Sequence, residues 1–191
     1  MKLDENTNYI VSGLERSGTS MLMQILNAGG LPIGFDESRP LDNNNPKGYY
    51  ELEGGKIINK LVDGLFPLDK YKGKFIKITS YGLKFLPPGK YKIIYSERNI
   101  EEILDSMEKM IGEKDGDREI TKEVFSKLNN ITKKIIQERK DIDILIVNYN
   151  NILLDPKNNL KKIIDFLGLS EDVLNKMVEA IDKKLYRQRR N

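Results

Sequence analysis

A short glycine-containing loop between a strand-like run and a helix-like run restricts the folding of this chain more than any other feature. Residues 9–12 (Tyr-Ile-Val-Ser) form an apolar run that is typical of a buried strand. The loop Gly13-Leu14-Glu15-Arg16-Ser17-Gly18-Thr19-Ser20 follows, and apolar side chains recur at helical spacing over residues 19–27. Glycines let backbone N–H groups turn toward one oxyanion, and a helix N-terminus adds about half a positive charge. The order of strand, loop and helix therefore predicts an anion-binding loop.

The loop nearly matches the P-loop of nucleoside triphosphate-binding proteins, with one informative departure. That pattern has a lysine directly after its second glycine, whereas this chain has Thr19. Arg16 offers a different cation, and its guanidinium suits bidentate binding of a phosphate or sulfate group. Thr19 and Ser20 are expected to cap the helix and to donate hydroxyls to the anion. The alternative is a tight strand–helix turn that binds no ligand.

Strand-like and helix-like segments alternate along the whole chain. Strands are predicted at residues 9–12, 75–78, 91–95 and 144–147, and helices at 19–27, 56–65, 100–110, 121–139 and from 155 to 168. This alternation predicts an α/β fold with a doubly wound, mostly parallel sheet flanked by helices. The Pro- and Gly-rich residues 31–55 are expected to lie outside the core, and the charged residues 112–118 to form a mobile loop. We expect residues 1–191 to form a single domain.

The chain contains no cysteine and no histidine, which narrows its chemistry. Thiol nucleophiles, imidazole bases and Cys or His metal ligands are excluded, so a proton acceptor must be a carboxylate, a lysine or a tyrosine. We expect no bound metal. The net charge of +3 is too small to indicate nucleic acid. The polar first residues and the lack of any run of ~20 apolar residues predict a cytoplasmic protein without a membrane partner.

A second candidate site follows the predicted strand at residues 91–95. Arg98 comes directly after this strand, and Ser106 lies eight residues further on, on the next predicted helix. The carboxyl ends of parallel strands meet at one crevice, so we expect Arg98 to lie near residues 13–20. The alternative is that Arg98 pairs with Glu101 or Glu102 and that Ser106 is an ordinary surface hydroxyl.

These segments together resemble the sulfotransferases that use 3′-phosphoadenylyl sulfate (PAPS). Residues 16–20 (Arg-Ser-Gly-Thr-Ser) match the family's 5′-phosphosulfate loop, and Arg98 with Ser106 matches its 3′-phosphate site in type and spacing. Residues 147–169 are similar to its last strand and helix. Residues 45–51 and 185–190 are similar to a group of short bacterial-type members. The resemblance implies a P-loop NTPase-like three-layer sandwich and transfer of a sulfuryl group from PAPS to a hydroxyl or amine.

The resemblance also implies roles for individual residues. Arg16 and the loop amides would hold the bridging and sulfuryl oxygens, and a set of neighbours would hold the 5′-phosphate: Ser17, Gly18, Thr19 and Ser20. Arg98 and Ser106 would hold the 3′-phosphate. Lys77 matches a lysine that better-known members place shortly before a catalytic histidine. Thr79 stands in the histidine's place here.

Because the chain lacks histidine, we expect a carboxylate to act as the general base. Glu51 is the first choice, since it lies among aromatic residues that could desolvate it, and Glu15 is the second. The acceptor is expected to be a small molecule or a glycan. Tyr49, Tyr50 and Tyr81 suggest an apolar or aromatic acceptor, although tyrosines also fill small cores.

Other functions remain open at this stage. A P-loop nucleotide kinase or NTPase shares the fold, but Thr19 in the lysine position argues against it. A non-catalytic nucleotide-binding relative would keep the anion loop without a base. Nucleic-acid binding through the basic residues 183–190 is the weakest alternative. Arg187 and Arg189 are expected either to reach the nucleotide, anchored by Leu185 and Tyr186, or to form a solvated tail.

Overall fold

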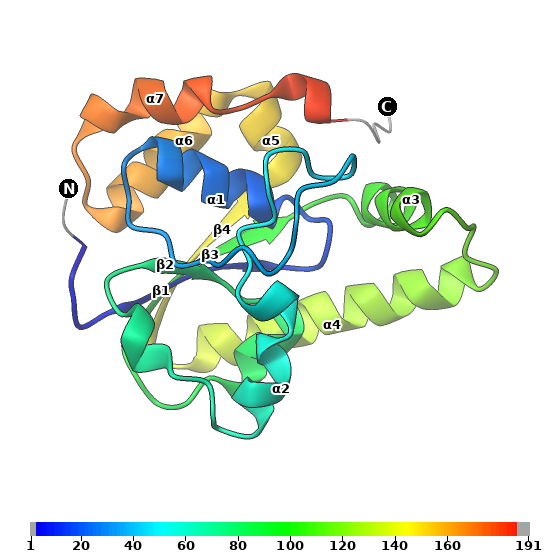
Figure 1. The fold of residues 1–191 in the computed structure, drawn as a ribbon, viewed down its shortest axis with the longest axis horizontal. Coiled ribbons are helices and arrows are strands. Elements are labelled where there is room, and N and C mark those ends of the chain that lie inside the picture. Colours follow the sequence, from blue (N-terminus) through cyan, green and yellow to red (C-terminus); the bar gives the residue numbers. More distant parts are fainter. Residues whose placement is uncertain (1–2, 187–191) are drawn as a thin grey trace.

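The computed structural model describes residues 3–186, and its centre is a parallel sheet (Figure 1). The strands are β1 (Asn8–Gly13), β2 (Phe75–Lys77), β3 (Tyr91–Glu97) and β4 (Ile142–Asn148). Their order across the sheet is β2-β1-β3-β4, and every neighbouring pair is parallel. In this register Ile10 of β1 lies opposite Ile76 on one side and Ile93 on the other. The predicted parallel sheet is therefore confirmed.

Helices cover both faces of the sheet (Figure 1). One face carries α1 (Thr19–Ala28), α5 (Tyr149–Leu154), α6 (Pro156–Leu167) and α7 (Leu174–Glu179). The other carries α2 (Ile57–Val62), α4 (Arg118–Glu138) and the 3₁₀ segment η3 (Ser80–Phe85), while α3 (Ile100–Ile111) packs against α4. Shorter 3₁₀ turns are η1 (Glu53–Gly55), η2 (Leu68–Tyr71), η4 (Glu171–Val173) and η5 (Lys183–Leu185). This arrangement confirms the predicted doubly wound α/β class.

Two apolar clusters, one on each face, make up the core. Tyr9 and Val11 of β1 point toward α1, α6 and α7, while Ile10 between them joins the cluster on the opposite face. Successive residues of a strand point to opposite faces, so a strand that is buried on both sides must be apolar at nearly every position. This requirement explains the continuous apolar runs that identified the strands in the sequence.

The largest difference from the sequence prediction concerns residues 31–55. Leu31, Tyr49 and Leu52 are buried to 3–4% exposure, so the expectation that this segment lies outside the core is wrong. The composition is that of a loop, and the structure does contain little helix there. However, the segment crosses a cavity, and its few apolar side chains are buried against the elements beneath it.

Helix boundaries also differ from the prediction. Helix α6 matches the predicted helical section at 155–168, but α5 before it was not predicted. The side chains of Asn148 and Asp155 cap α5 and α6 by accepting hydrogen bonds from the N–H groups of Asn151 and Asn158. Helix α4 begins at Arg118 rather than residue 121, so the charged loop is shorter than expected. Among residues 3–186, no helix is long and apolar enough to cross a membrane. The single-domain expectation stays a prediction.

Candidate functional site

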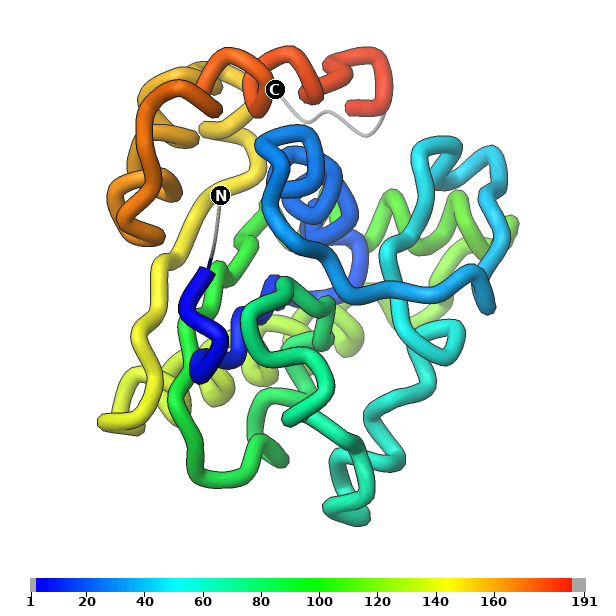
Figure 2. The backbone as a smooth tube through the Cα atoms, turned by 60° about the vertical axis from the view of Figure 1, so that its left-hand side comes forward, coloured from blue at the N-terminus to red at the C-terminus, as the bar shows by residue number. Residues whose placement is uncertain are grey.

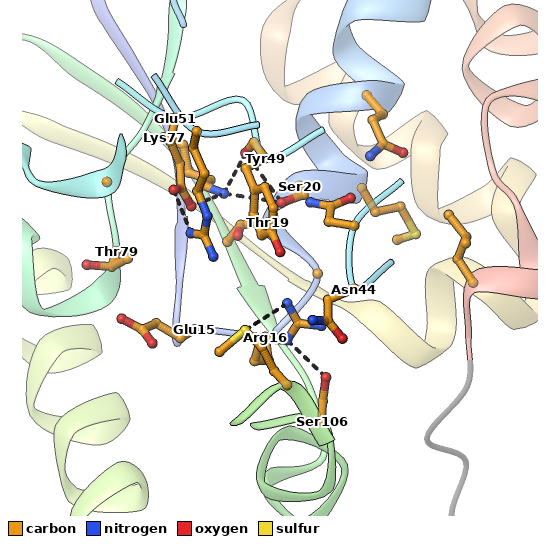
Figure 3. Close-up of a pocket in the computed structure, with 18 of the residues that line it drawn as sticks. Glu15, Arg16, Thr19, Ser20, Asn44, Tyr49, Glu51, Lys77, Thr79 and Ser106 are labelled. Atoms are coloured by element: carbon orange, nitrogen blue, oxygen red, sulfur yellow. Dashed lines mark hydrogen bonds and ion pairs between the residues drawn. The ribbon is translucent and has the colours of Figure 1, made fainter. Parts of the chain in front are cut away.

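A cavity of about 290 Å³ opens where the carboxyl ends of the strands meet, as the sheet topology requires (Figure 3). The basic side chains that line it are those of Arg16, Arg39, Lys77, Arg98 and Lys109. The acidic ones are those of Glu15, Glu51 and Asp182. This excess of positive charge favours a polyanionic ligand. Among residues 3–186, no group of three or more carboxylates is arranged to hold a metal ion.

The anion loop, residues 13–20, presents the start of α1 to this cavity. Gly18 is the N-cap residue, with φ of 100°, and no side chain caps the helix. The expectation that Thr19 and Ser20 cap it is therefore wrong, because both are already inside the helix. A Cβ atom on Gly18 would lie 2.2 Å from Cδ2 of Tyr149, so only glycine allows this close approach. The uncapped first turn leaves N–H groups available to an anion.

Arg16 connects the anion loop with the second predicted site. Its backbone is left-handed, with φ of 64°, and its Nε donates to the Ser106 hydroxyl at 2.9 Å. Its carbonyl oxygen accepts a hydrogen bond from Arg98 Nη1 at 3.1 Å. Burial lowers the pKa of Arg16. The structure thus brings Arg16, Arg98 and Ser106 together, and it confirms the expected closeness of Arg98 to the loop.

Ser17 is placed differently from its neighbours in the loop. Its side chain is buried beneath the backbone, where a Cβ on Gly13 would lie 2.5 Å from its hydroxyl oxygen. Ser17 donates its N–H to the Leu14 carbonyl at 3.2 Å, and its own carbonyl accepts from the Ser96 hydroxyl at 2.7 Å. Ser17 is not among the described lining residues, whereas Gly18, Thr19 and Ser20 are. In this arrangement Ser17 shapes the loop from below.

Lys77 joins the predicted base to the anion loop. Its Nζ lies 2.8 Å from Oε1 of Glu51 and donates to the Ser20 hydroxyl at 3.2 Å and to the Tyr49 carbonyl at 2.6 Å. The Lys77 side chain is only 5% exposed. Burial lowers the pKa of Lys77, and the adjacent Glu51 carboxylate opposes that shift. Glu51, Lys77 and Arg16, the three residues predicted to be catalytic, therefore all lie at the cavity, as Figure 3 shows.

Glu51 is held by two cations rather than by aromatic neighbours alone. Its second oxygen, Oε2, accepts from Arg39 Nη1 at 2.8 Å. Burial raises the pKa of Glu51, but Lys77 and Arg39 outweigh it and hold this pKa below its usual range. Aromatic neighbours were expected from the sequence to desolvate this carboxylate. In the structure, the ionised form is favoured instead.

Residues 36–55, here called the cover segment, form the opposite wall of the cavity and appear as loops beside the start of α1 in Figure 2. Side chains of the segment tie it to itself. Asp42 accepts hydrogen bonds from the Tyr49 hydroxyl at 2.7 and 2.8 Å, and Asp36 accepts one from the Glu53 N–H at 2.7 Å. The Arg39 guanidinium lies 3.5 Å from the centroid of the Tyr49 ring. These contacts bring Arg39 and Tyr49 to the cavity.

Several lining residues were not identified from the sequence. Arg39 and Lys109 carry no local pattern that separates them from other surface cations. Tyr149 lies near the start of the segment 147–169 that resembled the family, and its ring packs against Gly18. Glu15 and Thr79, which the sequence argument did single out, both line the cavity. Leu185 also lines the cavity. Arg187 and Arg189, which were expected to reach the nucleotide or to form a solvated tail, lie outside the described residues.

Comparisons with known proteins agree with this architecture. The model of the sulfotransferase domain family matches residues 6–190 of the chain. A search of curated protein sequences found no match. Among solved structures, the chain is similar to a sulfotransferase from Mycobacterium tuberculosis, with 14% identity, a TM-score of 0.58 and coverage of 93% of this chain and 72% of that chain.

Two further similar structures contain the nucleotide PAP. A mouse sulfotransferase complexed with PAP has 17% identity, a TM-score of 0.56 and coverage of 97% of this chain and 66% of that chain. Retinol dehydratase, in complex with androsterone and the inactive cofactor PAP, has 17% identity, a TM-score of 0.53 and the same two coverages. The chain therefore spans about two thirds of the length of these two proteins, and at such identities the likeness shows a shared fold.

Proposed function

This chain belongs to the sulfotransferase family, and we propose that it transfers a sulfuryl group from PAPS to a hydroxyl or amine of a polar acceptor. The family resemblance inferred from the sequence is thereby confirmed. One observation supports the proposed activity above the others. Lys77 contacts both the carboxylate of Glu51 and the hydroxyl of Ser20, so a proton acceptor and the anion loop meet at one buried amine.

The residues present suit PAPS as the co-substrate. The first turn of α1 would bind the 5′-phosphate through its uncapped N–H groups, with Thr19 and Ser20 beside it. Arg98 and Ser106 would bind the 3′-phosphate, and Arg16 would contact the sulfuryl and bridging oxygens. Ser17, whose hydroxyl lies beneath the loop, would act through the backbone shape of the loop rather than through its side chain.

The proposed reaction breaks the S–O bond to the 5′-phosphate while a new bond forms between sulfur and the acceptor oxygen or nitrogen. The nucleotide leaves as 3′,5′-adenosine bisphosphate (PAP) with the bonding electron pair, and the acceptor proton moves to Glu51. Negative charge spreads over the sulfuryl oxygens during transfer, so the chain contributes mainly positioning and electrostatic stabilisation. Arg16 and Lys77 provide positive charge on this path. Lys77 and Arg39 hold the pKa of Glu51 below its usual range, so Glu51 is in the ionised form that a proton acceptor requires.

The surroundings of Glu51 favour a hydrophilic acceptor, such as a sugar or an amino alcohol. Of the residues labelled in Figure 3, Lys77 and Tyr49 lie nearest to Glu51, and the polar side chains of Thr79 and Glu15 lie farther away along the cavity. Of the three tyrosines that suggested an apolar acceptor, Tyr50 packs against Phe35 and Tyr81 against Phe85, and neither is among the described lining residues. Tyr49 does line the cavity, and its hydroxyl donates to Asp42. A polar wall offers hydrogen bonds to hydroxyls but little apolar area to a sterol or retinoid.

Calorimetric titration with PAP, against magnesium–ATP as the comparison ligand, tests the nucleotide part. PAP should bind without magnesium, and Arg98→Ala should weaken it about 10- to 100-fold, because one charge-assisted contact is lost. Preference for magnesium–ATP would overturn the assignment.

Turnover with PAPS and a panel of sugars and amino alcohols tests the role of Glu51 as the base. Glu51→Gln should abolish turnover, while Glu53→Gln, a matched change in an exposed carboxylate of the same segment, should retain it. PAP binding without turnover of any acceptor would instead favour a non-catalytic relative.

A further inference from the structure

Arg98 is fixed on two edges of its guanidinium, although it lies at the cavity. Its Nε lies 2.9 Å from Oε2 of Glu102, one turn later in α3, and the two side chains are 7% and 1% exposed. Its Nη1 donates to the Arg16 carbonyl at 3.1 Å. Of the sequence alternative, the pairing of Arg98 with Glu102 is thus confirmed, whereas Ser106 is not a surface hydroxyl, since it is buried and accepts a hydrogen bond from Arg16. A guanidinium held in this way has little freedom to change its rotamer.

Glu102 also accepts hydrogen bonds from residues that are distant in sequence. The Tyr186 hydroxyl donates to Oε1 at 2.6 Å, and Asn150 Nδ2 lies 3.1 and 3.2 Å from the two oxygens. Asn150 Nδ2 also donates to the Tyr186 hydroxyl at 2.7 Å. One buried carboxylate in α3 therefore contacts the residue that follows β3, a residue of α5 and the last described residue of the chain. Such a carboxylate is stable only because several donors satisfy it.

Two aromatic rings also lie beside Arg98. Its Cζ atom lies 4.6 Å from the centroid of the Tyr149 ring and 5.6 Å from that of Tyr186. The two rings pack edge to face with centroids 5.7 Å apart. Burial, together with the hydrogen bond to Glu102, raises the pKa of Tyr186, so its hydroxyl remains a donor at neutral pH. Tyr186 thus touches Arg98 with its ring and touches the partner of Arg98 with its hydroxyl.

We infer that Glu102 and Tyr186 are positioning residues that hold Arg98 in place for the 3′-phosphate, so the C-terminal segment contributes to nucleotide selectivity. This inference rests on the proposed function. A role in stability alone explains the geometry less well, because buried ion pairs often contribute no more than apolar side chains of similar volume. Orientation in advance lowers the entropy cost of binding, and only the 3′-phosphate benefits from it.

The test compares PAP with 5′-AMP, which keeps the adenosine and the 5′-phosphate but lacks the 3′-phosphate. Both nucleotides are titrated into wild type, Tyr186→Phe and Glu102→Gln, with unfolding temperatures measured alongside. Tyr186→Phe keeps the ring and loses one hydrogen bond, so PAP affinity should fall about 3- to 10-fold, and Glu102→Gln should lower it about 10-fold or more. Affinity for 5′-AMP should stay within about twofold in both. Tyr81→Phe, at a tyrosine 44% exposed and outside the described cavity lining, is the matched control and should change neither.

The outcomes separate this inference from the proposed function. A selectivity ratio between PAP and 5′-AMP that stays at the wild-type value in Tyr186→Phe would overturn the inference while leaving the sulfotransferase assignment intact. An equal loss for both nucleotides would also overturn it, since it would indicate a general structural effect. Tyr186→Phe decides the matter if Glu102→Gln does not fold. Wild-type protein that binds no PAP would remove the proposed function itself and this inference with it.

Discussion

The two walls of the cavity are built by different means. The anion loop takes its shape from the backbone, through left-handed positions at Arg16 and Gly18 and a buried serine beneath it. The cover segment takes its shape from side chains, through the carboxylates of Asp36 and Asp42 and the ion pair of Arg39 with Glu51. A backbone-defined wall tolerates almost no change at its glycines. In a wall defined by side chains, each substitution should remove one contact and have a smaller effect on its own.

The largest effect is expected at the backbone-defined wall, for Gly18→Ala. The added Cβ would sit 2.2 Å from the Tyr149 ring at a φ of 100°, which alanine rarely adopts. Strain and overlap together should cost about 3 kcal/mol or more of unfolding free energy and should abolish PAP binding. Urea denaturation and calorimetry measure the two effects.

Gly30→Ala supplies the matched control for that prediction. Gly30 also has a positive φ, of 79°, but nothing lies within 4 Å of its would-be Cβ. Gly30→Ala should therefore lower the unfolding free energy by only about 1 kcal/mol and leave nucleotide binding unchanged. Equal effects of the two substitutions would mean that backbone strain alone, and not the approach to Tyr149, determines the need for glycine at the loop.

The same contrast explains what could be predicted from the sequence. Strand, loop and helix at residues 8–28 were found because the strand is apolar at successive positions and the glycines adjoin a helix. The position of Arg98 near the loop was predicted because Arg98 directly follows a strand, whereas Arg98 and Ser106 were identified as a phosphate site through the family resemblance. These features depend on neighbours in the sequence, and the sheet topology then brings them together without further information.

The cover segment could not be predicted in this way. Its composition indicates a loop, and nothing in it shows that Arg39 reaches Glu51, or that Tyr49 is buried. Similarly, the pair of Tyr186 and Glu102 joins residues 84 positions apart, and no local pattern signals it. The pKa of Glu51 was misjudged for the same reason, because it depends on two cations whose positions only the folded chain defines.

A smaller but still large effect is expected at the buried ion pair, for Lys77→Met. Methionine keeps much of the volume but leaves the Glu51 carboxylate, 11% exposed, with Arg39 as its cation. The loss should be about 3 kcal/mol of unfolding free energy. Lys60→Met breaks an exposed ion pair with Glu53 and should lower the unfolding free energy by less than about 0.5 kcal/mol. Similar losses for the two lysines would show that the Lys77 pair is no stronger than a surface contact.

A third prediction concerns the pH dependence of the Glu51 contribution. The folded-state pKa of Glu51 is lowered relative to the unfolded chain, so its stabilising effect is complete above the unfolded pKa and disappears as pH falls through the folded one. Glu51→Gln should therefore cost about 2 kcal/mol near pH 7 and progressively less below about pH 4. Urea denaturation of both proteins across this range measures the difference. A difference independent of pH would mean that the charge of Glu51 contributes nothing to stability.

The smallest effect is expected within the cover segment, for Asp42→Asn. Asn keeps one oxygen acceptor for the Tyr49 hydroxyl and for the N–H groups of Asn44 and Asn45, but it loses the charge. Because Asp42 is exposed, the cost should be only about 0.5 kcal/mol, and PAP binding should stay within about twofold. A double-mutant cycle with Tyr49→Phe isolates the contact between the two side chains. If Asp42→Asn weakened PAP binding as strongly as Arg98→Ala, the two walls would form one cooperative unit, and the distinction drawn between them would fail.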